Sequence, residues 1–239
     1  MPHRTINLEE AAQFLHLPVA DLSLLVRRNE VPHEKRAGAP VFRVMELEEW
    51  ASARLLGLKD AQLLDLHKTA SAKAHDLSQS HAIIPELMRP DYIAPDLAAK
   101  TRASVLRGMV QLADSTGLCI LSDDLLAGLE AREEMCSTAL ADGLALLHPR
   151  NHDPYMLEDS FVVLGRTTQP IPFGAPDGER TDLFFLVCCQ EDRIHLHVLA
   201  RLCMLCSQTD ILNRLRVVDG AGEMYEELVK AEEEVIKKL

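Results

Sequence analysis

The stretch DLFFLVCCQEDRIHLHVLARL, residues 182–202, combines a strand pattern with a helix pattern. Its apolar run from Leu183 to Cys189 is seven residues long, which is typical of a strand covered on both faces of a sheet. An acidic loop follows, and His195 lies at the start of the helical pattern. A second strand is expected at FVVLGR, residues 161–166. Strands of this kind mixed with helices predict an α/β layer structure.

The stretch REEMCSTALADGLALLHPR, residues 132–150, carries the residues best suited to chemistry. Arg132 and His148 are joined by a small-residue turn and a short apolar strand. Histidines at the ends of two sheet strands, together with an arginine, suit a phosphoryl group, because neutral imidazole is a nucleophile near pH 7 and donors stabilise the developing charge. Taken alone, His148, His195 and Arg132 also have ordinary readings as loop, helix-terminal and solvated residues.

Composition excludes several classes of protein. The chain has 239 residues, is 47% hydrophobic and carries a formal net charge of −12. An acidic balance argues against broad, sequence-independent binding of nucleic acid. No apolar run approaches the length of a membrane span, and the N-terminus lacks a secretion signal. The six cysteines have no framework spacing, so we expect reduced thiols in a cytosolic protein.

Residues 85–239 resemble the IIA domain of the fructose/mannitol class of the phosphoenolpyruvate-dependent sugar phosphotransferase system, which includes nitrogen-regulatory relatives. Its pattern of R-E, three residues and S-T-G-I-G-N-G-I-A-I-P-H corresponds to REEMCSTALADGLALLH. Its later motifs PDGxxxDLxFLL and H-L-x-x-L-A-x-L correspond to PDGERTDLFFLV and HLHVLARL. The resemblance implies a IIA-type mixed sheet flanked by helices.

The same resemblance assigns roles to three residues. It implies that His148 accepts a phosphoryl group from a small histidine-containing phosphocarrier protein. Arg132 and His195 would stabilise the phosphorylated state, and no cofactor or metal is implied. Because neither a sugar-permease segment nor a sugar pocket is evident, we expect a regulatory phosphocarrier rather than a sugar transporter component.

Four positions in the His148 segment depart from the family pattern. Leu147 replaces the proline before the acceptor, Pro149 the glycine after it, and Ala139 and Ala141 two turn glycines. Alanine does not share glycine's tolerance of positive φ, and proline removes a backbone N–H. We therefore expect an altered loop geometry. The alternative function is a regulatory module that binds a protein or DNA without being phosphorylated.

Residues 1–55 resemble the excisionase-type, MerR-like helix-turn-helix domain, with a turn-rich VPHEKRAGAPVFRV in the place of the wing. Asp21 and Leu24 stand where the family places Thr and Arg on its DNA-facing helix, which weakens the case for DNA binding. This segment has seven Lys and Arg against eight Asp and Glu, a net charge of −1. Candidate DNA contacts are Arg27, Arg28, Lys35, Arg36 and Arg43. The stronger alternative is a protein-contact or dimerisation module.

The remaining segments have simpler readings. Residues 56–84 are expected to form a helical linker, either a dimerising coiled coil in a homodimer or an amphipathic helix. Residues 85–160 are expected to be mostly helical, 221–237 to be helical, and the charged tail EELVKAEEEVIKKL, residues 226–239, to be a solvated amphipathic helix. The Cys203-x-x-Cys206 pair suggests half a zinc site in a metal-responsive DNA-binding protein, but cysteines in an apolar helix usually pack as small hydrophobes.

Overall fold

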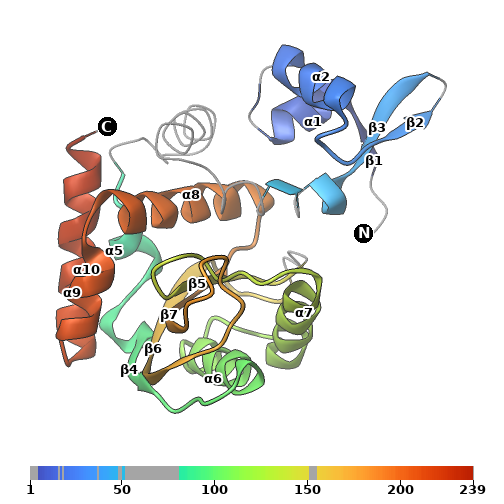
Figure 1. Cartoon of the computed structure of the whole chain (residues 1–239). Coiled ribbons are helices and arrows are strands. Elements are labelled where there is room, and N and C mark those ends of the chain that lie inside the picture. The colour runs from blue at the N-terminus through green and yellow to red at the C-terminus, as the bar shows by residue number, and fades with distance from the viewer. Residues whose placement is uncertain are drawn as a thin grey trace.

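In a computed structural model, the described residues are 5–15, 17, 19–36, 38–47, 50–51, 81–150 and 155–238. Two separate sheets are present in them, a three-stranded sheet in the order β1-β3-β2 and a four-stranded sheet in the order β4-β6-β7-β5 (Figure 1). The heptad pattern and linker expected over 56–84 fall almost entirely outside these residues. In the described part of the chain, no helix combines the length and apolar character needed to cross a membrane.

The larger sheet is built from β4 (Ile93–Leu97), β5 (Leu144–Leu147), β6 (Phe161–Ile171) and β7 (Thr181–Cys188). β4 pairs parallel with β6, β6 antiparallel with β7, and β5 parallel with β7. The expected α/β fold with a mixed sheet is therefore confirmed. The expectation of a mostly helical segment over 85–160 is wrong at β4, which contains Pro95 and lies at the edge of the sheet, where a missing N–H is tolerated.

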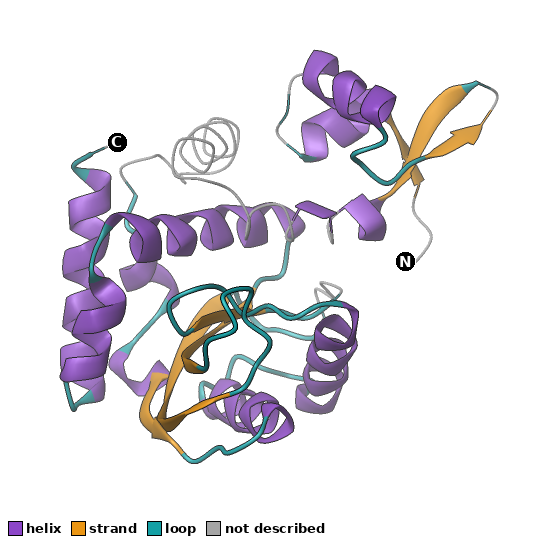
Figure 2. Ribbon diagram, in the orientation of Figure 1, coloured by secondary structure: helices purple, strands orange, loops and turns teal. Residues whose placement is uncertain are grey.

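Both faces of this sheet are covered by helices (Figure 2). Successive side chains of a strand point to opposite faces. Accordingly, Leu183, Phe185 and Val187 join one apolar cluster, whereas Phe184 and Leu186 join another. The first cluster includes residues of the helices α5 (Ile83–Leu87), α8 (Asp192–Gln208), α9 (Ile211–Val217) and α10 (Ala221–Ile236). The second includes residues of the 3-10 helix η1 (Pro90–Tyr92) and of α6 (Arg102–Ser115) and α7 (Ser122–Met135).

The C-terminal helix α10 is amphipathic as expected, but one of its charged residues is not solvated. Glu232 is 1% exposed. Its carboxylate accepts hydrogen bonds from the backbone N–H groups of Ile83 and Ile84, at 2.8 and 2.9 Å, and from Nη1 of Arg201 at 3.0 Å. The expectation of a fully solvated charged face is wrong at this position. Glu232 lies four residues after Leu228 and three before Val235, so helical spacing places it on the apolar side.

The N-terminal residues form a small unit of β1 (Thr5–Asn7), α1 (Leu8–Phe14), α2 (Val19–Arg28), β2 (Glu34–Arg36) and β3 (Ala39–Arg43). Asn7 and Glu10 form a capping box that begins α1, with both hydrogen bonds at 2.9 Å. The antiparallel pair β2–β3 lies within the segment expected to form a wing. The helix-turn-helix identity of this unit stays a prediction.

Candidate functional site

His148 and His195 meet at one edge of the larger sheet. His148 directly follows β5, and His195 lies in the first turn of α8, which follows β7. Because β5 and β7 are parallel, their carboxyl ends lie at the same edge, where ligand sites of α/β sheets commonly form. The two imidazole rings have a centroid separation of 5.0 Å. Residues separated by 47 positions in the sequence are thus brought into contact.

Hydrogen bonds fix both nitrogens of the His148 ring. Nδ1 lies 2.9 Å from the carbonyl oxygen of Leu146, and Nε2 lies 3.1 Å from Nε of Arg132. A carbonyl oxygen only accepts, so the network assigns the proton to Nδ1. Nε2 then carries the lone pair and accepts the hydrogen bond from Arg132. This tautomer gives His148 a nucleophilic nitrogen on the side of the arginine.

Arg132 projects from the last turn of α7 and is 3% exposed. Its Nη1 donates to the carbonyl oxygen of Cys136 at 3.0 Å and contacts the Cys136 sulfur at 3.2 Å. Its buried Nη2 has no hydrogen-bond partner among the described residues. Within the same residues no carboxylate lies within 4.0 Å of the guanidinium. A buried cation with only neutral partners is suited to receive an anion.

His195 completes the cluster from the other side. Its side chain is fully buried, and its position in the first turn of α8 sets it near the positive end of the helix dipole. That end favours an anion near the His195 ring, which in turn lies against the ring of His148. His197, two residues further along the helix, is also buried. Helix geometry turns its side chain away from that of His195, in keeping with a structural role.

The two alanines of the loop do not require the backbone conformation that only glycine tolerates. Left-handed φ values occur instead at the next two positions, Asp142 with 62° and Gly143 with 76°. Neither alanine has a positive φ, and the expectation of an altered loop geometry stays a prediction. The first described residues after the acceptor, Pro149 and Arg150, pack against α7.

Sequence reasoning missed two residues that support the loop, Glu133 and Thr138. Glu133 is 5% exposed, and its Oε1 accepts hydrogen bonds from the backbone N–H of Thr138 at 3.0 Å and from the Thr138 hydroxyl. Burial raises the pKa of this carboxyl above its ordinary value, although the bonds from Thr138 oppose the shift. The sequence signal that could have identified them is their position in the motif, since Glu133 follows Arg132 and Thr138 belongs to the S-T pair.

The candidate DNA contacts lie in the N-terminal unit, and three of them have acidic partners there. Arg28 lies 3.9 Å from Glu30, Arg36 lies 3.4 Å from Glu34, and Arg43 pairs with Glu34 and Glu46. These pairs are exposed and individually weak. They reduce the positive potential that phosphate contacts would need.

Of the cysteines around the Cys203-x-x-Cys206 pair, Cys188, Cys189 and Cys203 are buried, and Cys206 is partly buried. Cys188 and Cys189 pack on opposite faces of the sheet, in agreement with strand alternation. Burial raises the pKa of the Cys203 thiol to about 12 and that of Cys206 above its ordinary value. In the ranges that the structure describes, no three His, Cys, Asp or Glu side chains are grouped so that they could hold a metal ion. Thiols that resist ionisation are poor metal ligands.

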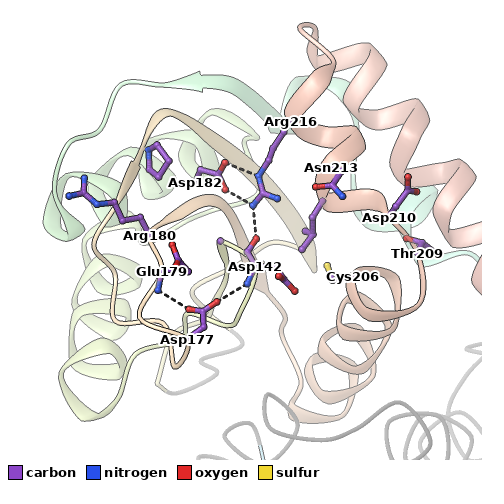
Figure 3. A pocket seen from close by; sticks show the side chains of 13 residues that line it. Asp142, Asp177, Glu179, Arg180, Asp182, Cys206, Thr209, Asp210, Asn213 and Arg216 are labelled. Atoms are coloured by element: carbon purple, nitrogen blue, oxygen red, sulfur yellow. Dashed lines mark hydrogen bonds and ion pairs between the residues drawn. The ribbon is translucent and has the colours of Figure 1, made fainter.

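A pocket of about 490 Å³ lies at the opposite end of β5 from His148 (Figure 3). Nε and Nη2 of Arg216 donate to the carboxylate of Asp182 at 2.8 and 2.7 Å, and Nη2 also donates to the carbonyl of Asp142. The hydrogen bonds to Asp182 raise the pKa of Arg216. Asp177 accepts from the backbone N–H groups of Asp142 and Glu179, so this end of the loop is held by its own set of bonds.

Comparison with known proteins identifies the family to which the α/β unit is similar. The family described as "Phosphoenolpyruvate-dependent sugar phosphotransferase system, EIIA 2" matches residues 86–231. A "Nitrogen regulatory protein" of Bradyrhizobium diazoefficiens is 30% identical over 145 residues, which cover 59% of this chain and 92% of that protein. Another of that description, from Klebsiella oxytoca, is 30% identical over 119 residues, 48% of this chain and 70% of its own.

Solved structures agree with this placement. The nitrogen regulatory protein IIA-Ntr of Neisseria meningitidis matches with a TM-score of 0.54 and 27% identity, covering 62% of this chain and 99% of that one. The IIA mannitol structure from Escherichia coli matches with a TM-score of 0.53 over 59% of this chain and 98% of its own, and at 17% identity it shows the fold alone. The sequence match and the fold together show that this chain belongs to the EIIA 2 family of the phosphoenolpyruvate-dependent sugar phosphotransferase system.

Proposed function

We propose that the chain is a cytosolic regulatory phosphocarrier in which Nε2 of His148 accepts a phosphoryl group from a histidine-containing phosphocarrier protein. The observation that supports this most is the cluster of Arg132, His148 and His195. It contains a tautomer whose Nε2 carries a lone pair that accepts the hydrogen bond from Arg132, and a buried guanidinium whose Nη2 has no hydrogen-bond partner among the described residues.

The transfer follows from these contacts. Nε2 of His148 attacks phosphorus, and a P–Nε2 bond forms as the bond from phosphorus to the donor's imidazole nitrogen breaks. The proton on Nδ1 stays, held by the carbonyl of Leu146. Nε of Arg132 moves its hydrogen bond from Nε2 to a phosphoryl oxygen, and Nη2 supplies a second donor. His195 and the first turn of α8 face the same charge, so the product anion is stabilised from two sides.

The test is phosphorylation with phosphoenolpyruvate and the general phosphotransfer proteins. The intact mass of the chain should rise by one phosphoryl group, and the group should be lost in acid, as phosphohistidine is. His148→Gln should abolish the gain. His81→Ala is the matched control, because His81 is exposed, contacts Glu86 and lies outside the cluster, so it should leave labelling unchanged. Absence of label on the wild type, under conditions that label a control IIA domain, would refute the proposal.

A second candidate function is a binding module that is not phosphorylated. The observation that favours it is burial, since His148 is 2% exposed and His195 fully buried, which leaves little of either residue accessible to an incoming partner. This function predicts no label, together with a stable complex with a protein partner in a pull-down that His148→Gln does not weaken. The phosphocarrier function predicts that Nε2 of His148 becomes accessible when the donor binds.

For the N-terminal unit we propose protein contact rather than DNA binding. The arginines at 28, 36 and 43 are paired with glutamates, and the exposed face of α2 also carries Leu24. Gel shifts with the purified full chain should show no specific DNA complex at physiological salt, whereas pull-down should recover a protein partner whose binding Leu24→Asp weakens. A specific, salt-sensitive DNA complex lost in Arg27→Ala and Lys35→Ala would reverse this assignment.

A further inference from the structure

The nucleophilic histidine is part of a closed chain of hydrogen bonds that begins and ends on α7. Arg132 donates to His148, whose ring bonds to the carbonyl of Leu146. The N–H of Leu146 in turn donates to the carbonyl of Thr138 at 3.2 Å. Thr138 donates its own N–H and its hydroxyl to Glu133, the neighbour of Arg132. The two ends of the chain are therefore adjacent residues in the last turn of one helix.

Burial of the Glu133 carboxylate, which holds the loop, carries a cost in free energy. It is almost fully buried, and its closest cation is Arg102, whose Nε lies 3.9 Å from Oε2. Burial of a carboxylate whose ion pair is this long carries a desolvation cost that the pair offsets only in part. The bonds that it makes are both directed to Thr138, so the interaction acts on the backbone at that residue. From there it reaches the Leu146 carbonyl that orients the imidazole.

We propose that Glu133 is a positioning residue for phosphoryl transfer, acting through Thr138 and Leu146 on the ring of His148. It holds the ring in the tautomer with Nδ1 protonated and keeps Nε2 directed toward Arg132 and the incoming phosphorus. The kinetic part of this inference rests on the proposed phosphocarrier function, whereas the part that concerns the ring does not.

The physical reason is that reactivity depends on alignment. Without the acceptor on Glu133, Thr138 has no partner for its N–H or hydroxyl, and the segment 138–140 that pairs with 144–146 loosens. The Leu146 carbonyl then holds Nδ1 less firmly, and the ring populates the other tautomer and rotated positions. A misplacement of about 1 Å at a reacting atom lowers a rate by roughly 100-fold.

The experiment compares four variants of the full chain. Glu133→Leu removes both acceptor oxygens, and Glu133→Gln keeps one carbonyl oxygen that can accept both bonds from Thr138. Thr138→Val removes only the hydroxyl donor. Glu134→Leu is the matched control, an exposed glutamate on the same turn with no hydrogen bond or ion pair among the described residues. Two quantities are measured on each variant, the tautomer ratio of His148 from ¹⁵N chemical shifts of the unphosphorylated protein and the initial rate of phosphorylation per folded molecule.

We expect Glu133→Leu to raise the fraction of His148 protonated on Nε2 and to slow phosphorylation by about 10- to 100-fold. Thr138→Val should change both in the same direction by less, and Glu133→Gln should restore both nearly to wild type. If Glu133→Leu does not fold, the tautomer ratio and the rate are both read from Thr138→Val and Glu133→Gln. Tautomer ratio and rate equal to those of Glu134→Leu in all folded variants would overturn the inference.

Failure of the proposed function is distinguishable from failure of this inference. If the wild type takes up no phosphoryl group, the tautomer ratio alone decides: a shift in Thr138→Val and Glu133→Leu, absent in Glu134→Leu, supports the positioning role. In that case an unchanged tautomer ratio overturns the positioning role.

Discussion

Two buried arginines of the α/β unit differ in what surrounds them. Arg201 on α8 is fully buried, and its Nη1 lies 3.0 Å from the carboxylate of Glu232, which also caps the start of α5. Arg132 on α7 is as deeply buried, but its partners are a neutral imidazole, a carbonyl and a thiol, and Nη2 has no hydrogen-bond partner among the described residues.

The charge of Arg201 is neutralised by a carboxylate of the fold, whereas the charge of Arg132 is available to bind an anion. A buried ion pair is costly to break, because removal of one partner leaves an uncompensated charge. A buried cation with neutral partners has the reverse property, since it gains when an anion arrives and loses nothing to competing carboxylates. We therefore assign Arg201 to the stability of the fold and Arg132 to function.

The largest expected effect is the loss of stability when the ion pair between Arg201 and Glu232 is broken. Glu232→Leu should lower the free energy of unfolding by about 3–5 kcal/mol, because Arg201 loses its carboxylate and the N–H groups of Ile83 and Ile84 lose their acceptors. Urea denaturation measures it. The double variant Arg201→Met with Glu232→Leu should recover part of the loss. A change below about 1 kcal/mol in the single variant would remove the distinction between the two arginines.

The second effect is on rate, at the other arginine. Arg132→Met should reduce the rate of phosphorylation of His148 by about 100- to 1,000-fold, because the developing charge loses its preorganised donors. Its free energy of unfolding should equal or exceed that of wild type, since a buried charge without a carboxylate partner is removed. Rapid-quench labelling and urea denaturation give the two values. A variant that is both active and destabilised would contradict the assignment.

The third effect concerns the neighbours of the two arginines, Glu133 and Glu232. Burial raises the pKa of both carboxyls above 4.5, so the folded protein keeps these protons to higher pH than the unfolded chain does. The stability linked to each proton is full below about pH 4.5 and is lost as the pH rises through the folded pKa. Each pKa unit corresponds to about 1.4 kcal/mol.

Glu133→Gln should remove this pH dependence, so that its stability relative to wild type increases between pH 4 and 7. Glu232→Gln should change in the same direction over this range, because burial raises the pKa of Glu232 as well. Urea denaturation at several pH values measures both. A relative stability of Glu133→Gln that falls as the pH rises would show that the sign of its pKa shift is wrong.

The smallest effect is expected at the thiol beside Arg132. Cys136→Ser keeps the backbone carbonyl that receives Nη1 and replaces sulfur with an oxygen acceptor. Because Cys136 is exposed, stability should change by less than about 0.5 kcal/mol, and the phosphorylation rate should stay near that of wild type. A large loss of rate would mean that the sulfur, and not the carbonyl, sets the orientation of the guanidinium.

Much of the fold and of the site was predictable because their signals are local. The run from Leu183 to Cys189 predicts a buried strand, and apolar spacing predicts α6 and α8. The motif letters point to Arg132, His148 and His195, which the fold brings together. β4 was not predictable in the same way, because five residues that include Pro95 carry no clear alternation and pair only once β6 is present.

The sequence by itself determined most strands and helices apart from β4, the family and the three polar residues proposed for the site. Only the tertiary structure decided which nitrogen of His148 carries a proton, which glutamate supports the loop and which arginine is neutralised. The periodicity of apolar residues that predicts strands and helices depends on neighbouring residues. The other properties depend on atoms of distant segments, such as Glu232 and Ile83, which are 149 positions apart in the chain. Burial and hydrogen-bond partners exist only after those segments pack together.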